Sequence, residues 1–202
     1  MKKFFCVFMT FTFCMICLMG CGKRLEVEES TVYVDQKGKV ISVDIEQLDQ
    51  SYYDETELKT FIEEQVSNYQ QSHGQEAKMS DFKVEDGEAV LKMEYDDCDA
   101  YTDFNGIELY SGSILEARAE GYDFEADFYS VEEDKVPVTK DVILEEEDYQ
   151  VVIIRKGIHV KVDGKVLYVS GKDVEKISKD TVSIPEPAEE SEEEILTYIV
   201  YK

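Results

Sequence analysis

A nearly unbroken apolar segment, residues 4–20, limits how this chain of 202 residues can fold. The segment is interrupted by only two threonines, and a pair of lysines precedes it. A short basic stretch followed by an apolar stretch is typical of a secretory signal, which is removed from the mature protein. We therefore expect residues 1–20 to take no part in the folded domain, which the remaining 182 residues would build.

The apolar segment ends in Leu18-Met19-Gly20-Cys21. This tetrapeptide resembles the lipobox of bacterial lipoproteins, in which small or apolar residues precede an obligatory cysteine. The resemblance implies that a type II signal peptidase cuts before Cys21 and that its Sγ atom carries a diacylglyceryl group, which would hold the protein on the outer face of the cell membrane. The alternatives are a cleaved signal without lipid and a retained transmembrane helix, although the segment falls slightly short of the about 20 apolar residues that span a bilayer.

The chain beyond residue 20 is strongly acidic, with 19 basic and 46 acidic side chains and a formal charge of −27. Nucleic acids require basic surfaces, so we expect no nucleic-acid partner. The same charge disfavours close contact with an anionic membrane surface. We expect the domain to stand off the membrane on a polar tether at residues 21–30, with the lipid on Cys21 as its membrane contact.

Cysteine usage indicates a fold without internal disulfides. Once the signal is removed and Cys21 is lipidated, Cys98 is the only thiol left in the chain. A single cysteine in an exported protein is either buried or available for pairing with another molecule. We expect Cys98 to be buried or half-buried.

The first part of the predicted domain combines two hairpins with a helix. Residues 31–35 and 39–45 are rich in β-branched side chains and predict the first hairpin. Asp54, with Glu57 three positions later, predicts the start of an amphipathic helix that ends at His73-Gly74. The second hairpin is predicted at 81–95, because its Asp86-Gly87 dipeptide favours a type I′ turn.

Shorter elements follow, and the character of the chain then changes. We predict a helix at 97–104, a strand at 107–110, and a helix opened by a Ser113 capping box. The later β-branched runs predict a small antiparallel β-meander and two closing strands, at 149–155, 158–162, 166–169, 181–184 and 195–201.

The fold class we expect is α+β, in two domains. The first, 31–131, is the two-hairpin-plus-helix unit, and the second, 138–202, is β-rich with an acidic loop at 185–194. The first unit resembles the uncharacterised small lipoproteins common in anaerobic Gram-positive bacteria, and this resemblance implies no activity. The closing strand is apolar on both faces, so we expect it to complete its own sheet; pairing with the exposed sheet edge of a partner is the alternative.

One cluster of oxygen-bearing side chains suggests a weak calcium site. Asp97, Asp99, Asp103 and Asn105 lie within nine residues. Their order does not fit an EF-hand loop, because Thr102 stands where the invariant glycine is required. The alternative interpretation is a helix start and a turn with exposed acids.

The supply of catalytic groups is small. The chain has two histidines, His73 and His159, which we expect at a helix end and on the outside of a hairpin. It has no G-x-S-x-G, P-loop, G-x-G-x-x-G or C-x-x-C sequence. Carboxylates are so numerous that proximity of two of them identifies no glycosidase. We expect no enzyme and no cofactor.

Tyrosine is abundant and tryptophan is absent. A tyrosine side chain combines a flat apolar ring with a polar tip, so several of them can form a platform for a glycan or peptide. The candidates are Tyr52, Tyr53, Tyr101, Tyr110, Tyr122 and Tyr129. The alternative is that they belong to a half-buried core.

These observations favour an exported, lipid-anchored binding or interaction module. An unknown envelope protein or a glycan would be its partner. A membrane-tethered enzyme of unfamiliar type and a structural envelope component are the alternatives.

Overall fold

The computed structural model describes residues 25–48, 53–132, 135–186 and 196–202. The predicted signal, Cys21 and most of the predicted acidic loop lie outside these residues. Within the described residues, no helix is both long and apolar enough to cross a bilayer.

The first of two sheets contains strands from both ends of the described chain. Its strands are β1 Thr31–Val34, β2 Val40–Gln47, β3 Ala77–Glu85, β4 Glu88–Tyr95, β9 His159–Val162, β11 Glu175–Lys176 and β12 Thr181–Ser183. Their spatial order is β11-β12-β9-β1-β2-β4-β3. All neighbours are antiparallel except β1 and β9, which pair in parallel.

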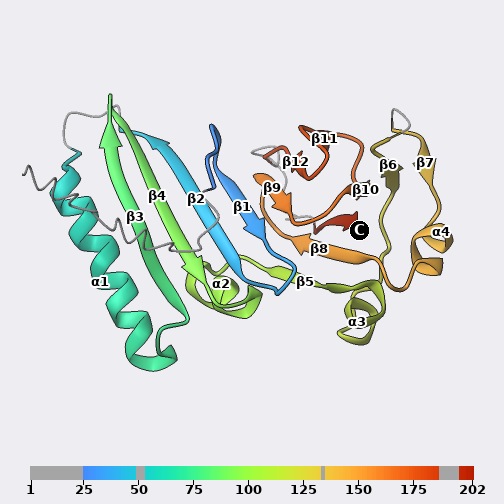
Figure 1. The fold of residues 1–202 in the computed structure, drawn as a ribbon, viewed down its shortest axis with the longest axis horizontal. Helices are drawn as coiled ribbons and strands as arrows, with labels where there is room; N and C mark the ends of the chain where they lie inside the picture. The colour runs from blue at the N-terminus through green and yellow to red at the C-terminus, as the bar shows by residue number, and fades with distance from the viewer. Residues whose placement is uncertain (1–24, 49–52, 133–134, 187–195) are drawn as a thin grey trace, which may run out of the picture.

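The second sheet lies beyond β1, at the opposite end of the molecule from β3 (Figure 1). Its strands are β5 Leu109–Ser113, β6 Phe128–Ser130, β7 Pro137–Val138, β8 Gln150–Ile154, β10 Val166–Ser170 and β13 Thr197–Tyr201. Their order is β5-β8-β13-β10-β6-β7, and all neighbours are antiparallel. The closing strand therefore completes its own sheet, as predicted.

Four helices accompany the sheets in the described residues. They are α1 Glu55–His73, α2 Cys98–Asn105, α3 Ile114–Ala119 and α4 Lys140–Glu145. α1 lies alongside β3 at one end of the first sheet (Figure 1). The mixed α+β class is confirmed.

Local sequence signals account for the start of the helices and the turn of the second hairpin. The Asp54 carboxylate accepts hydrogen bonds from the backbone N–H groups of Thr56 and Glu57, which would otherwise lack partners. Ser113 and Glu116 form a reciprocal capping box at α3. The hairpin turn has positive φ at both central residues, 53° at Asp86 and 82° at Gly87, as a type I′ turn requires.

The central strands of the second sheet are buried on both faces. β8 and β13 send alternate side chains into two apolar clusters. One cluster, which includes Val152 and Ile199, lies between the sheets and also takes in α1 and α2. The other, which includes Ile153 and Tyr198, lies beneath α3 and α4. The two-faced apolar pattern of β13 reflects this position between two cores.

The predicted small β-meander is wrong. β8, β9 and β10 do not pair with one another in chain order: β9 joins the first sheet beside β1, while β8 and β10 flank β13 in the second. β8 is buried on both faces, whereas β9 alternates buried valines with half-buried His159 and Lys161. Each sheet also draws strands from both predicted sequence ranges, 31–131 and 138–202.

An ion pair fixes the turn before β12 to β9 and predicts a pH dependence. Burial alone would raise the pKa of Asp180, but hydrogen bonds from Lys161, Ser178 and Thr181 outweigh it and lower the pKa from 3.8 to about 2. A carboxylate with a depressed folded pKa adds stability above its unfolded pKa, and that stability is lost as the pH falls through the folded value.

Asp180→Asn is therefore expected to lower stability at neutral pH. The loss should be at most about 1 kcal/mol, because the ion pair is partly exposed and solvent screens it. Urea unfolding at several pH values measures it, and the gap to the wild type should close between about pH 4 and pH 2. A gap that stays constant across this range would contradict the assignment.

Candidate functional site

Two of the four predicted calcium ligands, Asp97 and Asn105, hold the ends of α2, whereas Asp99 and Asp103 are exposed on this helix. The Asp97 carboxylate caps the helix by accepting a hydrogen bond from the Ala100 N–H, at 2.8 Å. At the other end of α2, Asn105 donates its amide hydrogens to the Tyr95 hydroxyl at 3.1 Å and the Tyr101 carbonyl at 2.8 Å. The described residues contain no group of three or more His, Cys, Asp or Glu side chains arranged to hold a metal. These positions add no support to the calcium hypothesis.

The histidines and Cys98 lie on different elements. His73 stacks on Tyr69 at the end of α1, with ring centroids 4.2 Å apart, and His159 lies on β9. Cys98 is buried, as predicted. Burial, together with nearby Asp97 and Asp99, raises the pKa of this thiol to about 12, so it is protonated and a poor nucleophile at neutral pH.

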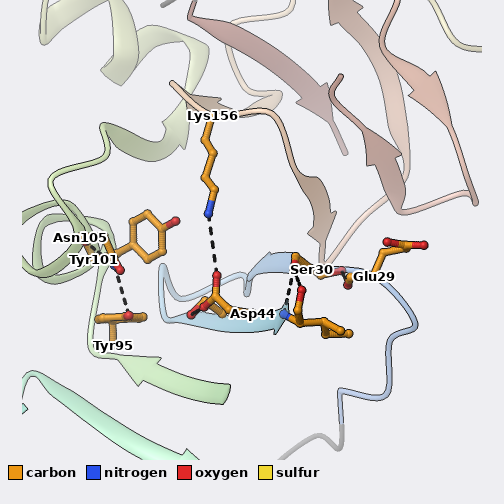
Figure 2. A network of polar contacts seen from close by, with 10 residues as sticks. Glu29, Ser30, Asp44, Tyr95, Tyr101, Asn105 and Lys156 are labelled. Atoms are coloured by element: carbon orange, nitrogen blue, oxygen red, sulfur yellow. Dashed lines mark hydrogen bonds and ion pairs between the residues drawn. The ribbon is translucent and has the colours of Figure 1, made fainter. Parts of the chain in front are cut away.

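A polar network joins the first sheet to α2 and to the turn between β8 and β9 (Figure 2). The Asp44 carboxylate accepts a hydrogen bond from the Ser42 hydroxyl at 3.1 Å and lies 3.8 Å from the Lys156 ammonium group. Burial raises the pKa of Tyr95 to about 12 and also raises that of Tyr101. Both phenols therefore stay neutral, and the contacts of the network connect elements of the fold.

The predicted tyrosines divide into separate groups. Tyr101 is buried, Tyr53 is exposed, and Tyr129 is half-buried on β6. Tyr52 lies outside the described residues. Tyr110 on β5 and Tyr122, which follows α3, come together, with ring centroids 4.9 Å apart and planes inclined by 49°. Two of the predicted platform residues thus form a half-buried aromatic pair.

This aromatic pair continues into the core. Tyr122 meets the buried Tyr198 ring edge-on at 6.5 Å, and Tyr198 in turn packs against Phe124 at 4.9 Å. Phe124 and Tyr198 belong to the buried cluster beneath α3 and α4, so Tyr110 and Tyr122 pack against a close-packed part of the core. Its rings are held in place before any ligand arrives.

An ion pair borders the two rings. Arg155, just after β8, donates from Nε at 3.1 Å and from Nη2 at 2.7 Å to the same Oε2 atom of Glu108. The Tyr122 hydroxyl donates to the other oxygen of Glu108, Oε1, at 3.2 Å. The ionic side chains are about one-third exposed, 33% for Arg155 and 35% for Glu108. Glu108, Tyr110, Tyr122 and Arg155 are hereafter called the Tyr110–Tyr122 surface.

The surroundings of this surface are acidic. The pKa of Tyr110 is raised by burial and then by the negative charges of Glu116 and Glu120. The pKa of Tyr122 is raised by burial and then by Glu108. Both phenols are therefore protonated at neutral pH, and the surface offers ring faces, hydroxyl groups and one internally paired carboxylate and guanidinium.

Sequence reasoning identified the two tyrosines but missed Glu108 and Arg155. These two residues are 47 positions apart and are brought together by the antiparallel pairing of β5 with β8. The only signal in the sequence is that these oppositely charged residues lie at the ends of two predicted strands. That signal identifies an ion pair only when the two strands are known to be neighbours.

Comparison of the chain with protein-family models, with curated proteins and with solved structures finds no match.

Proposed function

We propose that the protein is exported, is anchored by a lipid on Cys21 to the outer face of the cell membrane, and binds an envelope component through the Tyr110–Tyr122 surface. The observation that carries the binding role is a pair of tyrosines packed against the core and bordered by a paired carboxylate and guanidinium. Binding sites commonly combine aromatic area with a few fixed polar groups.

The anchor is inferred from the sequence. Two lysines, an apolar segment and Cys21 follow one another as in a lipoprotein signal. Residues 21–30, fully extended, reach about 35 Å. That length would keep the acidic domain close to the membrane while its charge keeps it off an anionic surface.

Binding is favoured over catalysis by the protonation state of the surface. A general base works best with a pKa near the operating pH. The pKa values of the Tyr110 and Tyr122 phenols are raised above the usual tyrosine value, which moves them further from neutrality. Glu108 accepts hydrogen bonds from Arg155 and from the Tyr122 hydroxyl, so the ion pair holds the Tyr122 ring in position.

The anchor and the binding role are tested together in a bacterial host. We expect the wild type to partition with membranes and to have a diacylglyceryl-bearing mass that starts at Cys21. Cys21→Ala should lose the lipid, because the acceptor Sγ atom is missing, and should keep the full-length mass, because the type II signal peptidase acts at the lipidated cysteine. Intact mass spectrometry and membrane fractionation measure both effects.

The mature chain without its signal and lipid, residues 22–202, then serves in a sedimentation assay with isolated cell envelopes. It should co-sediment, and adding Tyr110→Ala and Tyr122→Ala should abolish this. Tyr129→Ala, which changes a half-buried tyrosine outside the surface, is the matched control. A wild type of full-length mass retained in membranes would overturn the lipid anchor, and unchanged sedimentation of the double variant would overturn the binding role.

A further inference from the structure

We infer that the ligand of the Tyr110–Tyr122 surface is an uncharged oligosaccharide. This inference rests on the proposed binding function and adds the chemical class of the ligand. It follows from the chemistry of the surface, from its charge, and from the state of the neighbouring sheet edge.

The surface matches the two kinds of group that a sugar ring presents. A pyranose has C–H groups that pack on aromatic rings and a rim of hydroxyls that form hydrogen bonds. Tyr110 and Tyr122 supply the rings, and the Glu108 carboxylate beside them accepts three hydrogen bonds on its roughly four acceptor sites, so it can accept one more. A sugar seated on the rings would have hydroxyls within reach of the ionic pair.

The charge of the surface disfavours anionic ligands. Arg155 is neutralised by two hydrogen bonds to Glu108, so its guanidinium has a carboxylate partner already. Glu116 and Glu120 add negative charge close to Tyr110. The whole chain carries a formal charge of −25. Phosphate-bearing and uronic-acid polymers would be repelled by this field, whereas a neutral glycan would not.

The adjacent sheet edge disfavours a peptide bound as an added strand. Strand addition needs free N–H and C=O groups along an edge. β5 is an edge strand, but the Leu109 N–H donates to Thr102 Oγ1 at 3.1 Å, and that hydroxyl donates back to the Leu109 carbonyl at 3.4 Å. The Ser113 N–H donates to the Glu116 carboxylate at 2.8 Å. α2 and α3 thus occupy both ends of the edge.

The two rings are positioned in advance. The Tyr122 hydroxyl is tied to Glu108. The phenol of Tyr110 lies over Gly112, where an added Cβ atom would approach its hydroxyl oxygen to 2.5 Å. Rings that are already ordered lose little conformational freedom when a ligand binds. Shallow contact with a sugar can therefore suffice for measurable affinity.

The test uses the mature chain without its signal and lipid, residues 22–202, and three neutral probes, the β-1,4-linked tetramers of N-acetylglucosamine, glucose and mannose. A galacturonic acid tetramer is the anionic comparison. Because the chain has 13 tyrosines, whose fluorescence would not single out the two rings, isothermal titration calorimetry measures the binding. We expect at least one neutral tetramer to bind, with little dependence on salt concentration. The anionic tetramer should bind more weakly.

Variants assign the binding to the surface. Tyr122→Ala should weaken binding of the neutral tetramer about five- to tenfold, because a stacking ring is lost. Tyr122→Phe retains the ring and should lose less, and it remains informative if the alanine variant folds poorly. Tyr129→Ala should bind as the wild type does.

The outcomes separate this inference from the proposed function. If no neutral tetramer binds, or if the anionic tetramer binds better, the carbohydrate inference is overturned. If envelope sedimentation still depends on the tyrosines in that case and is lost when the envelopes are treated with protease, the binding function stands and the ligand is a protein. If neither assay depends on the tyrosines, both proposals fail.

Discussion

Ile199→Ala is expected to lower the free energy of unfolding by about 2–5 kcal/mol, the range for removing a large aliphatic side chain from a packed core. Ile199 is fully buried on β13 and belongs to the apolar cluster between the two sheets. β13 itself lies between β8 and β10, so neighbouring backbone on both sides limits collapse around the cavity. Urea unfolding followed by circular dichroism measures the loss.

Ile177→Ala is the matched control, because it makes the same change at a side chain that is 54% exposed, just after β11. Its expected effect is within about 0.5 kcal/mol of zero. Equal losses for the two variants would contradict the central position of β13 in the packing.

Gly157→Ala is expected to cost about 1–3 kcal/mol through overpacking. A Cβ atom at this position would lie 2.5 Å from the Glu186 Cα and 2.6 Å from the Pro185 carbonyl oxygen. Both are backbone atoms, and the Ile184 N–H bonds to the Ile158 carbonyl beside them at 3.0 Å. The clash can be relieved only by moving a paired segment. Thermal and urea unfolding measure the effect.

Gly112→Ala provides the comparison. An added Cβ atom here would also have a contact of 2.5 Å, but with the hydroxyl oxygen at the tip of Tyr110. A small tilt of the Tyr110 ring relieves this contact without moving backbone, so the expected loss is about 1 kcal/mol or less. If Gly157→Ala is as stable as Gly112→Ala, the expectation is wrong, because the backbone at Pro185-Glu186 then moves away at little cost.

Local signals allowed much of the secondary structure to be predicted. Caps at Asp54 and Ser113 act through hydrogen bonds to the next three residues, so the sequence around them contains the whole interaction. The same holds for the Asp86-Gly87 turn, which needs only two residues that tolerate positive φ. The short strands β6 and β7 and the helix α4 were missed, because elements of two to six residues carry little periodicity.

Such local signals could not predict which strands pair. β9 reads like its neighbours in sequence, yet it crosses to the first sheet and pairs in parallel with β1, more than a hundred residues away. A β-branched run predicts a strand, but its partner depends on which buried faces meet. For this reason the sequence predicted a local meander, whereas each of the two sheets in the structure combines strands from both predicted domains.

For the candidate site, too, some features follow from the sequence and others only from the tertiary structure. The sequence by itself determined the apolar N-terminal segment, the acidity and the tyrosine-rich composition without tryptophan, because each of these is a property of residue identity alone. Tertiary structure alone decided that Tyr110 meets Tyr122 and that Glu108 meets Arg155. Those contacts depend on β5 lying beside β8, and long-range strand pairing is set by the packing of the whole core.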